Sequence, residues 1–193
     1  MNSLLDTLHS RHSFPASQLT EPAPDEQQLK NILRCAIAAP DHGKLHPWRF
    51  IVIRGSARNA LADVFVEAAK SRDPGISDQK LERMSEKPLR SPLIVVIVTT
   101  LTPDHPKAPE IEQTLSAGAA VQLMQLGATA TGFGSIWLSG ANAYDENVKQ
   151  ALGIEEKDQI TGFLYLGTPP ETRPTRRRPE LAAHVTEWTA SLT

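Results

Sequence analysis

Residues 92–100 read Pro-Leu-Ile-Val-Val-Ile-Val-Thr-Thr, and this stretch decides the fold. Its centre, Leu93 to Val98, is apolar at every position, which is typical of a strand that is covered on both faces. The run is far too short to cross a bilayer, and we therefore expect no membrane span here. A strand of this kind requires helices on both sides of its sheet.

Helical and strand patterns alternate on either side of this stretch. The clearest helix follows Asp25, which has Gln28 three residues later, the spacing of a capping box. A longer helix follows Pro109 and is apolar or small nearly all round, which favours burial. The apolar line that we expect along it is Ile111, Leu115, Ala119, Gln122 and Leu126. Further helices are expected at about 3–10, 60–71, 77–87 and 145–152, and further strands at about 48–54, 135–138 and 160–166. This alternation predicts an α/β or α+β layered domain.

The composition is that of an ordinary globular protein. The chain has 193 residues, 40% of them hydrophobic and 22% charged, with a formal net charge of -2. These values exclude a wholly disordered or collagen-like chain and a surface devoted to nucleic acid. We predict one domain over residues 1–193, with 168–193 as an extended basic tail. The single cysteine, Cys35, is expected to be a packed thiol, and it fits a cytoplasmic location.

Two segments near the N-terminus could bind a ligand. Arg11, His12 and Ser13 group a cation, an imidazole and a hydroxyl at a helix end, which suits a phosphate, although a solvated helix end would look the same. The loop at 39–48 carries His42 and His46 between two rigid elements. We expect no metal there, because the loop supplies neither the third ligand nor the helix that a histidine pair needs.

Two later segments complete the candidates. Residues 132–140 read Gly-Phe-Gly-Ser-Ile-Trp-Leu-Ser-Gly, and their glycines permit close approach of the main chain to a planar ligand. They are not a dinucleotide fingerprint, because they follow a helix and precede a strand. In the tail, Arg173 and Arg176 to Arg178 are either a solvated face or, together with Arg11, a phosphate site. No catalytic nucleophile is evident, which is compatible with a cofactor that carries the chemistry.

Taken in order, these segments resemble the nitroreductase family, in particular its small YdjA-like branch. The resemblance rests on residues 11–13, 21–24, 29–34, 39–42, 47–48, 116–119, 132–140 and 162–169, and so covers nearly the whole chain. It implies an α+β fold with a central mixed or antiparallel sheet flanked by helices. It also implies an intertwined homodimer that holds one FMN at each of two sites between the subunits.

The resemblance also assigns candidate roles to residues. Arg11, His12 and Ser13 match the motif that contacts the FMN phosphate and ribityl chain. The main chain of Trp137, Leu138 and Ser139 matches the stretch that approaches the flavin. The remaining candidates are His42 reaching the partner's flavin, Ala38 where some relatives carry a basic residue, Arg177 as a tail cation on the phosphate, and Gly127, Ala128, Thr129, Ala130, Thr131 and Gly132 as a nicotinamide region.

The function implied is an FMN-dependent oxidoreductase. Hydride would pass from NADH or NADPH to FMN and then to a nitroaromatic or quinone acceptor in a two-stage, ping-pong reaction. One alternative is a reductase of a specialised metabolite that reduces nitro groups incidentally. A second is a flavin-binding carrier or sensor without turnover, and a nucleic-acid-binding role for the basic tail is the least favoured.

Overall fold

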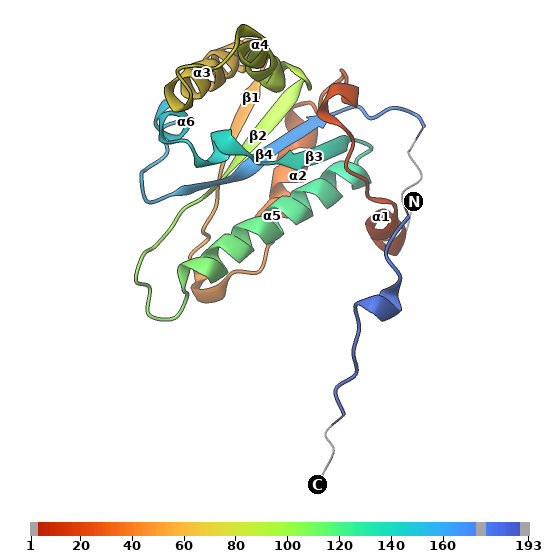
Figure 1. The fold of residues 1–193 in the computed structure, drawn as a ribbon. Coiled ribbons are helices and arrows are strands. Elements are labelled where there is room, and N and C mark those ends of the chain that lie inside the picture. The colour runs from red at the N-terminus through yellow and green to blue at the C-terminus, as the bar shows by residue number, and fades with distance from the viewer. Residues whose placement is uncertain (1–3, 173–176, 190–193) are drawn as a thin grey trace.

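A computed structural model describes residues 4–172 and 177–189 and contains one four-stranded sheet (Figure 1). The strands are β1 (Arg49–Arg54), β2 (Leu93–Thr99), β3 (Gly134–Leu138) and β4 (Gln159–Gly167). Their order is β1-β2-β4-β3, and each neighbouring pair is antiparallel. Every residue of β2 is buried, which confirms the prediction from its continuous apolar run. β1 and β3 are therefore the edge strands.

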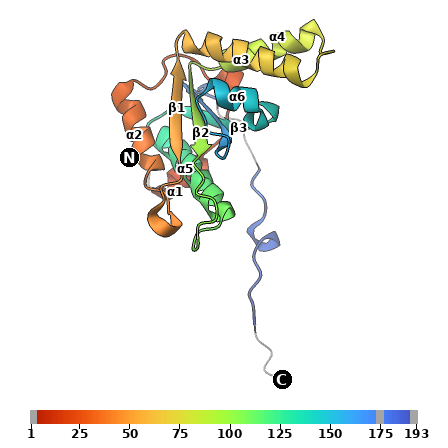
Figure 2. The ribbon, with the colours of Figure 1, turned by 90° about the vertical axis from the view of Figure 1, so that its left-hand side faces the viewer.

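Helices cover both faces of the sheet, and two apolar clusters form the core (Figure 2). One face is covered by α2 (Glu26–Ala36) and α5 (Glu110–Ala130). The other is covered by α3 (Ala57–Arg72), with α4 (Asp78–Glu86) and α6 (Glu146–Ala151) packed against α3. The α+β fold with an antiparallel sheet between helices is thereby confirmed.

The capping box of α2 is present as predicted. The main-chain amide of Gln28 donates to Asp25 Oδ1 at 2.8 Å, and the amide of Asp25 donates to Gln28 Oε1 at 2.9 Å. The pair satisfies two amides that the first turn of a helix otherwise leaves without partners. The start of α2 is thus fixed by its own sequence.

The apolar line expected along α5 is not its buried side. Ile111 and Leu115 are each 64% exposed, whereas the buried side includes Ala117, Ala120 and Val121. A helix that is apolar all round gives no preferred face by periodicity. Its orientation follows from its small residues, since close packing against α2 is possible only where the side chains are short.

The close packing of α5 against α2 is clearest at Gly127. A Cβ atom at this position would lie 2.9 Å from Cys35 Sγ and 3.5 Å from Ile32 Cα, so glycine is needed there. Cys35 was expected to be a packed thiol, but it is exposed despite this contact. It lies at the margin of the helix pair, where one side of the residue remains open.

The two ends of the described chain lie outside this core. The short α1 (Leu4–Ser10) contacts α5, and its leucines Leu4 and Leu5 are exposed. Residues 177–189 extend away from the body in both views (Figures 1 and 2) and carry exposed Leu181, Val185 and Trp188. Over the described residues, the helices lack the length and apolar content that crossing a membrane requires.

The end of β3 is held in place by a tryptophan that packs on a glycine. Trp137 Nε1 donates to the carbonyl oxygen of Thr161 at 3.2 Å, and the indole covers Gly162 of β4. A Cβ atom at Gly162 would lie 2.1 Å from Trp137 Nε1 and 2.8 Å from the Leu138 carbonyl oxygen. Only glycine allows β3 and the indole to lie so close to β4.

We therefore expect Gly162→Ala to lower the free energy of unfolding by about 1–3 kcal/mol, the usual cost of overpacking. Urea denaturation followed by circular dichroism measures this loss as a lower midpoint. Gly75→Ala is the matched control, because a Cβ atom there makes only an ordinary contact at 3.6 Å with Asp73. Equal midpoints for the two variants would show that the indole moves aside without cost.

Candidate functional site

The outer edge of β3 provides main-chain groups to the candidate site. β3 is an edge strand, and an edge strand presents main-chain amides and carbonyls that lack a neighbouring strand. Within the described residues, the bridge on this edge is that of Ser13 with Ser135, where the Phe14 amide donates to the Ser135 carbonyl oxygen at 3.1 Å. In the predicted segment, Trp137 and Leu138 end the strand beyond this bridge and Ser139 follows it, and all three residues are exposed.

The predicted phosphate motif lies against this edge. Arg11 Nη1 donates to Ser13 Oγ at 3.3 Å, so the two polar groups are side by side. His12 Nδ1 lies 2.6 Å from the carbonyl oxygen of Ser10 and, because a carbonyl can only accept, Nδ1 carries the proton. Its Nε2 is the nitrogen left for a ligand. All three residues are half-buried.

One arginine of the predicted tail cluster, Arg178, contacts this segment. Arg178 Nη2 donates to the Arg11 carbonyl oxygen at 2.5 Å and to the His9 carbonyl oxygen at 3.3 Å. Arg177 is instead exposed, with Nη2 3.8 Å from Glu180 Oε1. Arg178 thus covers carbonyls at the end of α1, where a cation is favourable. The other two tail arginines of the sequence analysis, Arg173 and Arg176, lie outside the described residues.

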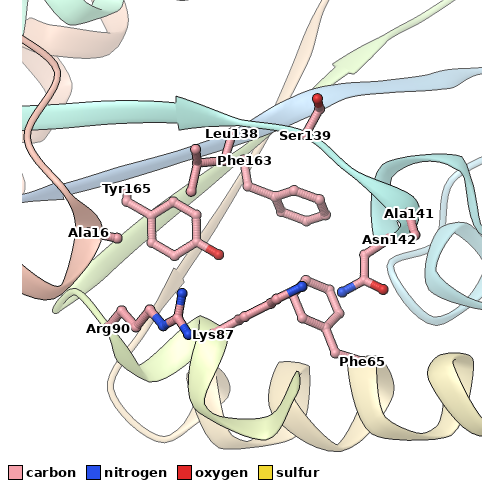
Figure 3. A pocket seen from close by; sticks show the side chains of 10 residues that line it. All are labelled: Ala16, Phe65, Lys87, Arg90, Leu138, Ser139, Ala141, Asn142, Phe163 and Tyr165. Atoms are coloured by element: carbon pink, nitrogen blue, oxygen red, sulfur yellow. The ribbon is translucent and has the colours of Figure 1, made fainter. Parts of the chain in front are cut away.

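A cavity of about 360 Å³ opens on the α3 face beside the end of β3 (Figure 3). Small-molecule sites commonly have volumes from about 300 to 1,000 Å³ and combine apolar walls with a few polar groups. Here the polar groups are Lys87, Arg90, Asn142 and the Tyr165 hydroxyl, and Leu138 and Ser139 form the wall shared with β3. Figure 3 shows the Tyr165 hydroxyl and the Lys87 amine directed into the space between them.

The cavity changes the acid–base behaviour of two of these groups. Burial lowers the pKa of the Lys87 amine, and the nearby positive charges of Arg90 and Arg72 lower it further. Burial raises the pKa of Tyr165 to about 12, an effect that the charge of Arg90 partly opposes. Tyr165 therefore keeps its proton at neutral pH and can donate a hydrogen bond. Displaced pKa values in a cleft are typical of functional sites.

Asn142 is held in the cavity wall from behind. Arg72 Nη2 donates to Asn142 Oδ1 at 2.8 Å, while Arg72 Nη1 is bonded to the buried carboxylate of Asp145. Because Oδ1 is occupied, the amide nitrogen of Asn142 is the group left for a ligand. Asp145 also accepts from the amides of Asn147 and Val148, which fixes the start of α6. The cavity therefore has a rigid polar wall.

His42 lies on the opposite face of the sheet. Its Nδ1 is 2.5 Å from Glu112 Oε2 in the first turn of α5, and a shallow surface pocket beside it is lined by Leu115 and Ala119. Ala38 lies in the turn two residues after α2 and is exposed. Within one chain, the structure therefore does not bring His42 to the Lys87 cavity.

The predicted nicotinamide region forms the C-terminal end of α5 and the turn after it. Gly127 and Ala128 are buried against α2, so the accessible part of this region begins at Thr129. Gly132 has a φ of 86°, a left-handed conformation in which glycine is unstrained. These positions are close in sequence to the start of β3, and their role stays a prediction.

Four cavity residues were not predicted from the sequence: Lys87, Arg90, Asn142 and Tyr165. One signal was present: Lys87 and Arg90 stand on either side of a tight turn that leads directly into the buried strand β2. A basic turn next to a fully buried strand could have indicated a cavity with a positively charged rim at the end of that strand. Asn142 and Tyr165 gave no such signal, because only the fold brings them to Lys87.

Comparisons with known proteins identify the family of this chain. The model of the Nitroreductase family matches residues 10–168. The relative called "Putative NAD(P)H nitroreductase YdjA" from Escherichia coli (strain K12) is 45% identical over 165 residues, which are 86% of this chain and 87% of YdjA.

Solved structures share the fold. A nitroreductase-like family protein from Bacillus cereus has a TM-score of 0.82 at 21% identity, with 97% of this chain and 96% of that chain covered. A nitroreductase with bound FMN from Bacteroides fragilis has a TM-score of 0.69 at 20% identity, with 98% and 100% covered. The match of the family model over most of the chain and the high identity to YdjA show that this chain belongs to the nitroreductase family.

Proposed function

We propose that this chain is an FMN-dependent NAD(P)H oxidoreductase that reduces nitroaromatic or quinone-type acceptors in two stages. The observation that carries the proposal is the cationic cavity beside the end of β3, a strand whose outer edge also carries the Arg11 segment. The relatives support it, because YdjA carries the name "Putative NAD(P)H nitroreductase" and the Bacteroides fragilis structure contains bound FMN.

The residues present fit the parts of FMN. The phosphate needs cations and hydroxyl donors, which Arg11 and Ser13 offer 3.3 Å apart. The three-ring system needs a flat apolar wall and polar groups at one edge, which Leu138 and the groups around Lys87 offer. The free main chain of β3 joins these two places, so one elongated ligand could span both.

A second copy of the chain is part of the proposal. Ile111 and Leu115 on α5 and Leu4 and Leu5 on α1 form exposed apolar surface on two helices in contact. Surface of this kind marks an interaction site in a soluble protein. His42 lies on the same side, beside α5. We propose that two copies pair through this surface and that His42 of each completes the flavin site of the other.

FMN, when bound, supplies the redox chemistry by taking a hydride from NAD(P)H and giving it to the acceptor. The protein binds and orients. The positive charges of Lys87 and Arg90 stabilise negative charge that develops on a ligand in the cavity, which is an electrostatic contribution prepared before the reaction. Tyr165 and Asn142 donate hydrogen bonds there without changing their protonation state.

The function is tested by the absorbance spectrum of the purified protein before and after NADPH is added without oxygen. We expect a yellow protein with about one FMN per chain, bleached by NADPH and restored by a quinone. A colourless protein that gains no flavin absorbance when FMN is added would overturn the proposal. Bound FMN that NADPH and NADH both fail to bleach would indicate a carrier without turnover.

The phosphate contact is tested by comparing Arg11→Ala with Arg178→Ala. Arg178 already donates to two main-chain carbonyls, so its removal should act mainly on the end of α1. We expect Arg11→Ala to raise the dissociation constant of FMN about 10-fold or more, the usual effect of losing a charged hydrogen bond, and Arg178→Ala to raise it less. Titration of flavin-free protein with FMN, followed by fluorescence, measures both values. Equal losses would place the phosphate elsewhere.

The pH dependence tests Lys87. An amine carries its positive charge below its pKa, and burial lowers the pKa of Lys87. We therefore expect the rate of flavin reduction by NADPH to fall as the pH rises toward about 10, before an ordinary lysine would lose its charge. Lys87→Arg should remove this fall, because a guanidinium stays protonated throughout. Stopped-flow measurements across this range decide, and the same alkaline fall in Lys87→Arg would exclude Lys87 as its cause.

A further inference from the structure

The exposed His42–Glu112 contact joins two residues whose main chains are both held in place by neighbouring contacts. The two side chains are 56% and 43% exposed, and Nδ1 lies 2.5 Å from Oε2. Exposed pairs of this kind usually contribute little to stability, since ordering two side chains offsets the attraction. Where the two main chains are already fixed, only the side-chain torsions remain to be ordered, so part of that cost is absent.

The main chain at Glu112 is fixed by the next residue in α5, Gln113. Gln113 is buried at 2% exposure, and its amide nitrogen donates to the carbonyl oxygens of Thr102 at 2.9 Å and Ala108 at 2.8 Å. Its side-chain oxygen accepts from the Thr102 amide at 2.8 Å. These three bonds fix the first turn of α5, and with it the position of Glu112, against the loop that precedes the helix.

The loop that carries His42 is ordered as well. Asp41 Oδ2 accepts from the amide of His46 at 2.7 Å, which closes the loop around the turn His42–Lys44. Gly43 lies inside that turn with a φ of 81°, and a Cβ atom there would come within 3.4 Å of His105. The loop therefore packs against the segment that also anchors α5, so His42 and Glu112 share one rigid support.

The pair leaves one defined nitrogen on His42. A carboxylate can only accept, so the short Nδ1–Oε2 contact requires a proton on Nδ1. Nε2 is then the nitrogen available to a ligand. His42 lines a shallow pocket together with Pro40, Asp41, Leu115, Ser116 and Ala119, and the imidazole is the one nitrogen-bearing side chain among these six.

We propose that Glu112 is the positioning residue of the shared site: it holds His42 so that Nε2 is presented to the FMN bound by the second copy of the chain. The inference rests on the proposed function and adds the residue that acts through His42. Glu112 touches neither cofactor nor substrate. It removes the rotational freedom of the imidazole and selects its Nδ1-protonated form. The binding of FMN then carries neither the cost of ordering the ring nor the cost of selecting its protonated nitrogen.

The test is a double-mutant cycle on FMN binding by the full-length protein. Glu112→Met removes the carboxylate and keeps a good helix former, and His42→Ala removes the group through which it acts. Glu110→Met is the matched control. Glu110 lies half a turn earlier on α5, so its substitution removes the same charge from the same helix end. The dissociation constant of FMN is measured for the wild type, the three single variants and His42→Ala/Glu112→Met.

We expect Glu112→Met to raise the dissociation constant about 10-fold, as for the loss of a hydrogen bond to a charged group, and Glu110→Met less than about 2-fold. In the His42→Ala background, Glu112→Met should have no further effect. Nitrogen-15 NMR of the histidines should show protonated Nδ1 on His42 in the wild type and loss of that preference in Glu112→Met. A purely structural Glu112 would weaken binding equally with and without His42, and the proposal would then be wrong.

The cycle separates this inference from the proposed function. If the wild type binds FMN and is bleached by NADPH while Glu112→Met matches Glu110→Met, the function stands and the role of Glu112 is refuted. If the wild type does not bind FMN at all, the proposed function fails, and the positioning role fails with it. Circular dichroism and the urea midpoint of each variant identify any that are less stable. For such a variant, the NMR state of His42 is compared under conditions in which the protein is fully folded, and this comparison decides.

Discussion

The burial of β2 on both faces is the constraint on which the rest of the structure depends. A strand with no exposed side chain lies in the middle of the sheet and needs helices above and below it. The two helix layers place the candidate functional groups on opposite faces of the sheet. The Lys87 cavity lies on the α3 side, and the His42–Glu112 pair lies on the α5 side. No movement of side chains can bring these two groups together through a packed core.

The elements that sequence alone could predict are those whose signal is local. β2 is one, because six consecutive apolar residues admit no wet face, and α2 is another, because Asp25 and Gln28 specify its first turn. The orientation of α5 could not be predicted, since an apolar residue stands on every side of it. Its buried face is set by the close packing of Gly127 against Cys35 of α2. That contact depends on both helices and cannot be recognised from α5 alone.

The same distinction holds for the candidate site. Arg11 to Ser13 and Trp137 to Ser139 are contiguous motifs, and the structure sets both on the edge of β3. The cavity could not be predicted, because Lys87, Asn142 and Tyr165 come from a turn, a loop and a strand that meet only in the folded chain. Glu112 and His42 are 70 residues apart, and neither has a sequence context that points to the other.

The proposed twofold dimer would account for this division of the site between two sides of one chain. In a twofold pair, both copies use the same surface patch. A residue at one end of the patch on one copy therefore contacts residues at the opposite end of the patch on its partner. The exposed Ile111 and Leu115 provide apolar surface on the side that carries His42. Pairing there buries this surface and, in the same step, can set His42 of one copy against the β3 edge of the other. A flavin between them would then depend on folding and on association at once, and a single chain would hold only half of its contacts.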